Sequence, residues 1–156
     1  MADSKRQRIV AAIVDRMKLI NGSGGYATNI TNRSYDSPPN IDQESGEIPC
    51  VGVYDQAASA NPTSTGRTYD IIHVMTVTIR GWVKRGSTAS AARALLKDLQ
   101  KAVRVDDKWT VGGVQLAMQT RQVSEDIIRS PDTFETDGCM LEIEVQFITK
   151  KFNAEE

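Results

Sequence analysis

A stretch near the end of the chain constrains the fold most, because apolar side chains recur there at every second position. Between residues 139 and 147 these apolar positions are Cys139, Leu141, Ile143, Val145 and Phe147. The positions between them include the polar residues Glu142, Glu144 and Gln146. Successive side chains of a β-strand point to opposite faces, so this segment predicts a strand with one buried and one wet face. Strands of this kind form antiparallel sheets, since parallel sheets are usually covered on both faces.

Other segments predict further strands. Apolar residues alternate with polar ones from Thr68 to Lys84, and again over Val114–Gln119 after a turn at Gly112-Gly113. Ile48–Tyr54 is a short apolar run that predicts a buried strand, and Tyr26–Ile30 predicts a weak one.

Polar segments separate these strands. Gln56–Gly66 consists of small and polar residues that cannot pack a core, so it predicts a surface loop. Ser124–Gly138 predicts a second polar loop, and a third runs through Pro38-Pro39.

Two segments have the apolar spacing of helices. Ser4–Ile20 is apolar on one face; Ser4 and Gln7 have capping-box spacing, and Asn21-Gly22 supplies a stop. Ala89–Arg104 has a cleaner apolar stripe and a basic opposite face. The stripe consists of Ala92, Leu95, Leu96, Leu99, Ala102 and Val103.

The order of helix, strands, helix and strands predicts the architecture. The 156 residues have the length of one ordinary domain, so we expect residues 1–156 to form a single domain. We expect an α/β chain of the α+β type, with a single mainly antiparallel sheet and two helices packed on one face.

Composition and charge exclude several classes of protein. The chain carries 19 Lys and Arg residues against 20 Asp and Glu residues, a net charge of -1. Proteins that track a nucleic-acid backbone usually have a basic excess, so dedicated DNA binding is disfavoured. The longest apolar stretch, Ile9–Val14, is far too short to cross a bilayer. Without a secretory signal, Cys50 and Cys139 are expected to be buried, reduced thiols.

The residues that could carry catalysis form no complete set. Gly81 and Gly86 have the spacing of a phosphate-binding loop, but Ser87 occupies the position of the essential lysine. Ser87 or Thr88 is therefore expected to cap the following helix. His73, the only histidine, could pair with a cysteine, but its apolar strand face favours a hydrogen-bonded core or interface histidine. We expect no catalytic residue, no cofactor and no metal site, because one histidine and two cysteines fall one ligand short of a structural zinc site.

The basic helix face is the strongest sign of an interaction. Arg93, Lys97 and Lys101 are spaced four residues apart, a spacing at which like charges repel. They form either a solvated face or a docking surface for an acidic strip on another subunit, such as Glu142 and Glu144. Two further candidate contact residues flank the predicted loop. Gln56 begins it, and Arg67 follows it directly.

The order of elements resembles that of phage tail terminator proteins. The similarity lies in an opening helix with the sequence RIVAAIVDRMKLI, a segment EIPCVGVY and a long strand YDIIHVMTVTIRGWV. It continues in a helix ASAARALLKDLQKAV and a closing strand CMLEIEVQFITKKF, and covers most of the chain from Arg8 to Phe152. It is a pattern of elements, and no catalytic or interface residue is transferred with it.

This resemblance implies a structural function. Tail terminator proteins form a hexameric ring that caps the head-proximal end of the tail tube, stops its polymerisation and presents a docking surface to the head connector. The expected partners are other copies of the chain, the tail tube protein and a connector or neck protein. DNA would pass through the ring without tight binding. The protein would reside in the virion tail or neck after assembly in the host cytoplasm. The alternatives are another neck component, such as a head-closure or head–tail connector protein, and a nucleic-acid-binding module.

Overall fold

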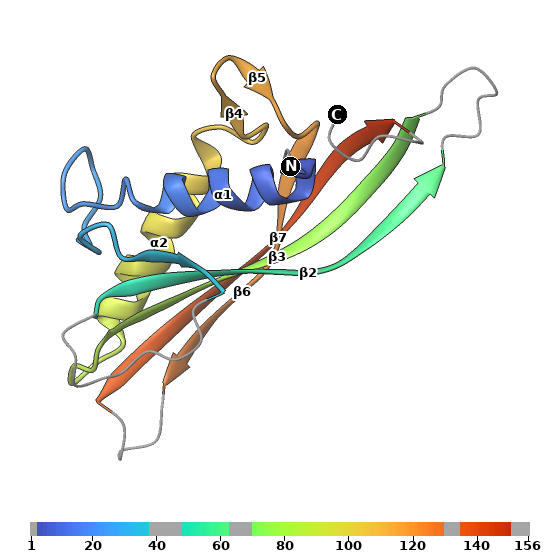
Figure 1. Cartoon of the computed structure of the whole chain (residues 1–156). Coiled ribbons are helices and arrows are strands. Elements are labelled where there is room, and N and C mark those ends of the chain that lie inside the picture. Colours follow the sequence, from blue (N-terminus) through green and yellow to red (C-terminus); the bar gives the residue numbers. More distant parts are fainter. Residues whose placement is uncertain (1–2, 38–47, 63–69, 130–134, 151–156) are drawn as a thin grey trace.

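The computed structural model describes residues 3–37, 48–62, 70–129 and 135–150, which contain two helices and seven strands. In chain order these are α1 (Lys5–Met17), β1 (Ser34–Asp36), β2 (Cys50–Pro62), β3 (Asp70–Lys84), α2 (Ser90–Arg104), β4 (Thr110–Val111), β5 (Val114–Gln115), β6 (Gln119–Arg129) and β7 (Thr136–Lys150). Figure 1 shows long twisted strands with both helices on the same side of the sheet.

Five of the strands form the main sheet, in the order β1-β2-β3-β7-β6. β1 runs parallel to β2, and every other neighbouring pair in this order is antiparallel. β4 and β5 form a separate hairpin around Gly112-Gly113, whose two residues both have positive φ as the predicted turn requires. The predicted α+β fold with a mainly antiparallel sheet is confirmed. The sequence predicted a single sheet, whereas the β4–β5 hairpin forms a second, two-stranded sheet.

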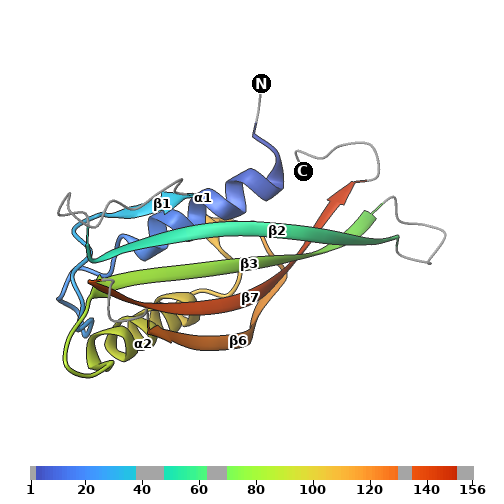
Figure 2. The same ribbon diagram turned by 90° about the horizontal axis from the view of Figure 1, so that it is seen from below.

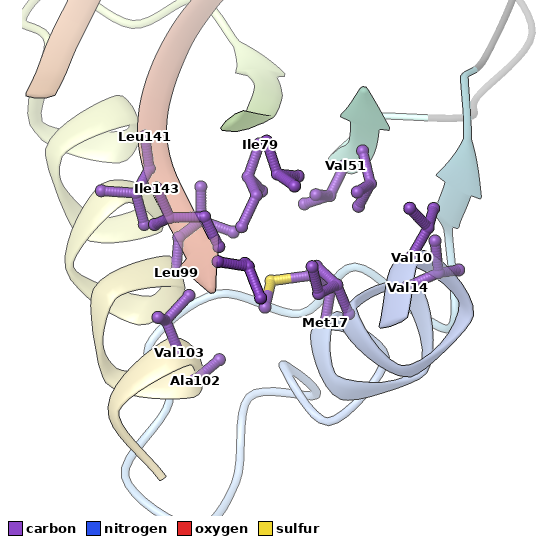
Figure 3. Close-up of a cluster of buried hydrophobic side chains, with 14 of the residues drawn as sticks. Val10, Val14, Met17, Val51, Ile79, Leu99, Ala102, Val103, Leu141 and Ile143 are labelled. Carbon is purple, nitrogen blue, oxygen red and sulfur yellow. The ribbon is translucent and has the colours of Figure 1, made fainter. Parts of the chain in front are cut away.

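The core lies between the two helices and one face of the main sheet. In Figure 3, Val14 and Met17 of α1 pack toward the strands, as do Leu99 and Val103 of α2. Leu141 of β7 and its neighbours on the same strand face complete this layer. The helices thus cover what we call the inner face. We call the opposite side the open face, because no helix or strand among the described residues packs on it.

The first helix begins as the sequence predicts but ends earlier. The Ser4 side chain accepts a hydrogen bond from the Gln7 amide, and the Gln7 side chain accepts one from the Ser4 amide, which completes the capping box. The helix ends at Met17, and Ile20 is held by a turn bond from its amide to the Met17 carbonyl. The predicted end of the helix at Ile20, before Asn21-Gly22, was therefore three residues too late.

The second helix confirms the apolar stripe but not its predicted cap. All six residues of the stripe are buried. The residue at the N-cap is Ala89, and no side chain caps the helix, so the expectation for Ser87 or Thr88 was wrong. Ala89 is itself buried, so packing fixes this helix start.

Both polar segments predicted as loops contain strand residues. β2 continues to Pro62, so most of Gln56–Gly66 is strand, while residues 63–69 lie outside the described part. β6 continues to Arg129 through the first part of Ser124–Gly138. In both places the strand forms because its main chain pairs with a longer neighbouring strand. The side chains there are mostly exposed, so the sequence shows no alternation of apolar residues that would predict a strand.

Two short predicted strands were also wrong. Tyr26–Ile30 contributes only one isolated bridge, between Asn21 and Asn29. The strand expected over Val114–Gln119 is interrupted, because β5 ends at Gln115 and β6 begins at Gln119. The third loop predicted, through Pro38-Pro39, lies outside the described residues.

Candidate assembly surfaces

The exposed side of α2 forms a basic groove. A hollow of about 350 Å³ is lined by Lys97, Gln100, Lys101, Arg104 and Val105. A second hollow of about 360 Å³ adjoins it toward β6, shares Gln100 and Arg104, and adds Asp107, Thr120 and Gln122. We call the two hollows together the basic groove.

Three cations of this surface have no acidic partner among the described residues. Arg93, Lys97 and Arg104 are exposed, and none of them forms an ion pair with another described residue. Like charges three or four residues apart on a helix repel each other. A groove with unpaired cations is a surface on which an acidic partner gains favourable interactions.

Lys101 differs from the other cations because it holds part of its own chain. Its Nζ atom donates a hydrogen bond to the Gly24 carbonyl at 2.8 Å and lies 4.6 Å from the centre of the Tyr26 ring. Of the three basic residues that the sequence singled out on α2, Lys101 is therefore partly engaged in the fold.

Asp98 has a structural role that was not predicted from the sequence. Its carboxylate is 3% exposed and accepts hydrogen bonds from the amides of Ala27 and Thr28, the shortest at 2.7 Å. The helical spacing carried a signal, since Asp98 lies three residues after Leu95 and four before Ala102, on the edge of the apolar stripe. Asp98 and Lys101 together fix residues 24–28 against α2.

The acidic residues singled out by the sequence lie on the open face, away from the groove. Glu144 is bound by Arg121 of β6, whose Nε and Nη2 atoms both lie 2.6 Å from the same carboxylate oxygen. Glu142 is in register with Thr78, whose hydroxyl accepts a hydrogen bond from the Gln56 side chain at 2.9 Å. The structure therefore brings Gln56, Glu142 and Glu144 to one face and keeps them apart from α2. Arg67 lies outside the described residues.

The open face also carries an aromatic group that the sequence did not suggest. The Arg80 guanidinium lies 5.1 Å from the centre of the Trp82 ring, and its buried Nε atom has no hydrogen-bond partner in the described part of the chain. Burial raises the pKa of the nearby Tyr54 hydroxyl, while the charge of Arg80 acts in the opposite direction.

The β4–β5 hairpin presents apolar side chains to solvent from a fixed base. Trp109 at this base is fully buried, and its Nε1 atom donates to the Thr120 hydroxyl at 2.8 Å. Burial alone would raise the pKa of Asp106, but bonds from the Thr110 and Lys108 groups and the charge of Arg16 lower it overall. Val111 and Val114 of this hairpin are about half exposed, and so is Met118, which follows the hairpin.

The ends of three strands project beyond the helices. We call residues 58–62 of β2, 70–74 of β3 and 146–150 of β7 the strand arm. Figures 1 and 2 show β2 and β3 running past the start of α1. The first turn of α1 touches the arm at two points: Arg6 pairs with Asp55, just before the arm, at 2.5 Å, and Lys5 donates to the Ile148 carbonyl within it.

The phosphate-loop spacing has a packing explanation. Gly81 lies inside β3, so the predicted strand conformation of this segment is confirmed. A Cβ atom on Gly81 would come within 2.5 Å of a Leu95 methyl carbon and 2.9 Å of the Cys139 sulfur. The glycine allows α2 to approach the sheet.

The single histidine lies in the strand arm, where it takes part in packing. The His73 ring stacks on Phe147 with 4.9 Å between ring centres, and its Nε2 atom is 2.7 Å from the Thr149 hydroxyl. Among the described residues, no three potential ligands are grouped to bind a metal. Within the same residues, no helix has the length and apolar character to span a bilayer.

Comparison with known proteins adds no relative. The chain matches no protein-family model and no curated protein sequence. Its function is therefore inferred from its own surfaces.

Proposed function

We propose that this chain is a structural virion protein of the tail terminator type. In this function several copies form a ring on the head-proximal end of a phage tail tube, stop its polymerisation and offer a docking surface to the head connector. The proposal makes the protein a non-enzymatic component of the tail or neck.

The strand arm is the observation that carries this proposal. An isolated two-stranded hairpin is only marginally stable in water, and a wider ribbon is stable only with a packed apolar face. Ile71 and Ile72 of the arm are adjacent residues of one strand, so they face opposite sides of it, and both are partly exposed. An arm with partly exposed apolar side chains on both faces is stabilised further when a neighbouring molecule packs on it.

The distribution of surfaces supports assembly by the same chain. A ring needs two different complementary surfaces on each subunit, because its contacts are head-to-tail. The basic groove, the open face and the arm are three surfaces of different chemistry on one small domain.

The arm supports assembly in a different way from the one the sequence suggested. The sequence predicts Gln56–Gly66 to be a surface loop, and deletion of Ala57–Thr65 from such a loop would leave the thermal melt nearly unchanged. Because residues 58–62 pair with β3, such a deletion would remove strand pairing as well as a contact surface. Point substitutions in the arm are the better test.

Capping of tail tubes tests the proposal directly. Purified chain would be mixed with phage tail tubes, and electron microscopy would show whether it occupies one tube end and stops growth. The double variant Ile72→Lys, Val74→Lys should fold and fail to cap. The matched control Val123→Lys changes an exposed valine in the bulge of β6 and should cap normally. Tubes that grow unchanged in the presence of the wild-type chain would contradict the proposal.

A further inference from the structure

We infer that the basic groove binds an extended, acidic segment of another protein. The inference goes beyond the proposed ring, because it assigns a partner to a surface that each single chain carries. The partner is defined by its chemistry, a short run of carboxylate side chains on a strand-like stretch.

Three cations of α2 form a row along the groove. Arg93, Lys97 and Arg104 are separated by four and seven residues, spacings that place side chains on one side of a helix. Lys97 and Arg104 line the hollows, and Arg93 continues the row by one turn. All three are exposed and have no ion-pair partner among the described residues. The row carries like charges that repel one another until the carboxylates of a partner neutralise them.

The acids on and beside α2 are engaged elsewhere. Asp98 is buried and accepts hydrogen bonds from the amides of Ala27 and Thr28. Glu125 of β6 accepts hydrogen bonds from two glutamine side chains. Asp107 lines only the hollow beside β6. The row is therefore left without a counter-charge from the described part of the chain, and the groove becomes less positive toward β6.

The length of the row sets the length of the bound segment. Arg93 and Arg104 are eleven residues apart on α2, which is about 16 Å along the helix axis. An extended chain advances about 3.3 Å per residue, so about five to six residues cover the row. Every second side chain of such a segment points to the same face, so three acidic side chains can meet the three cations.

The lining of the groove favours a polypeptide over a nucleic acid. None of the described residues that line the two hollows is aromatic, so bases would find no ring to stack on. Asp107 would repel phosphates that continue past Arg104 toward β6, and the chain as a whole has a net charge of -1. Val105 lines the first hollow and is 61% exposed, which suits an apolar side chain of a peptide.

Binding of a defined acidic peptide tests the inference. The probe is a fluorescein-labelled peptide of six glutamates, and the control peptide has six glutamines. Both are titrated with the purified full chain at low salt, and binding is measured by fluorescence anisotropy. The glutamate peptide should bind at least about tenfold more tightly than the glutamine peptide, and added salt should release it.

Neutral substitutions in the row locate the binding site. The groove variant carries Arg93→Gln, Lys97→Gln and Arg104→Gln, which keep good helix formers on α2. It should bind the glutamate peptide at least about tenfold more weakly than the wild type does. Thermal melts show that the variant is folded, and the single variant Lys97→Gln repeats the test if the triple variant unfolds.

A matched control removes the same charge from other parts of the surface. It carries Arg8→Gln, Lys18→Gln and Arg121→Gln, at positions that line neither hollow. This variant should bind the glutamate peptide like the wild type. An equal loss in the control and the groove variant would show that net charge, and not the row, attracts the peptide.

Other outcomes also overturn the inference. Equal binding of the two peptides, equal binding by the groove variant and the wild type, or no binding of the glutamate peptide by the wild type would each do so. Tighter binding of a labelled DNA duplex than of the glutamate peptide would make the groove a nucleic-acid site. If the peptide dissociates a ring of the wild-type chain, the occupant of the groove is a second copy. The ring itself is tested separately, by the native mass of the wild-type chain without peptide.

Discussion

Gly81 of β3 lies directly beneath Leu95 of α2, so close that a Cβ atom at position 81 would come within 2.5 Å of a leucine methyl carbon. Leu95 is fully buried, so neither group can move aside without disturbing the core. Because Gly81 has no side chain, α2 can pack closely against the sheet at this point.

Replacing this glycine should destabilise the protein. Gly81→Ala forces a methyl group into a filled space and should lower the free energy of unfolding by about 1–3 kcal/mol, measured by urea denaturation. The other glycine of the same motif gives a control, because a Cβ atom on Gly86 makes only an ordinary contact at 3.4 Å with the Thr88 carbonyl. Equal stability of Gly81→Ala and Gly86→Ala would contradict the packing explanation.

Asp98 should contribute more to stability than any exposed acid of the chain. Asp98→Ala leaves the Ala27 and Thr28 amides without their acceptor and should cost about 2–4 kcal/mol. Asp15, which pairs with Lys18 at the surface, is the control, and Asp15→Ala should cost less than about 1 kcal/mol. Similar losses in the two variants would show that the buried carboxylate does not hold residues 24–28.

The parts of the fold that the sequence predicts well are those with large side chains in a regular pattern. The stripe on α2 and the alternation in β7 mark both the element and its buried face. β1 could not be predicted in this way, because three residues carry no period and pairing with β2 alone places them. The far half of β2 was missed because its small, exposed side chains resemble a loop.

The candidate surfaces were predictable only in part, for a related reason. The spacing of Arg93 and Lys97 is local and fixes their common helix face. Pairing of Glu144 with Arg121 depends on the register between β6 and β7, including a bulge between Gln122 and Ser124, and no local pattern contains it.

Protonation of His73 should destabilise the folded chain. Burial lowers the pKa of His73 from its ordinary value of 6.5, so the unfolded chain binds this proton more readily than the folded one. The free energy of unfolding should therefore decrease as the pH falls below 6.5, and this part of the decrease should be absent in His73→Asn. NMR titration is unambiguous, since the chain has one histidine. A folded-state pKa at or above 6.5 would contradict the packed position of the ring.

The two cysteines should stay reduced and react slowly. Cys50 is opposite Trp82, and Cys139 is opposite Gly81, so the two thiols point to different faces from strands about 10 Å apart. This separation is too large for a disulfide. Burial raises the pKa of the Cys139 thiol to about 12, although a backbone hydrogen bond at Gly81 acts against it. Under native conditions a thiol reagent should label both cysteines far more slowly than in urea. Rapid native labelling, or an intact mass two hydrogens lower, would contradict this expectation.

The mass of the native particle in solution tests the central claim most directly. Native mass spectrometry over a range of protein concentrations, at low salt and with and without DNA, would count the 17.2 kDa chains in each particle. We expect one closed species above a threshold concentration, with six chains by analogy to tail terminator rings. Its mass should not change with DNA, and added salt should dissociate it. A chain that stays monomeric at every concentration, forms an open-ended series of masses, or assembles only on DNA would contradict the account.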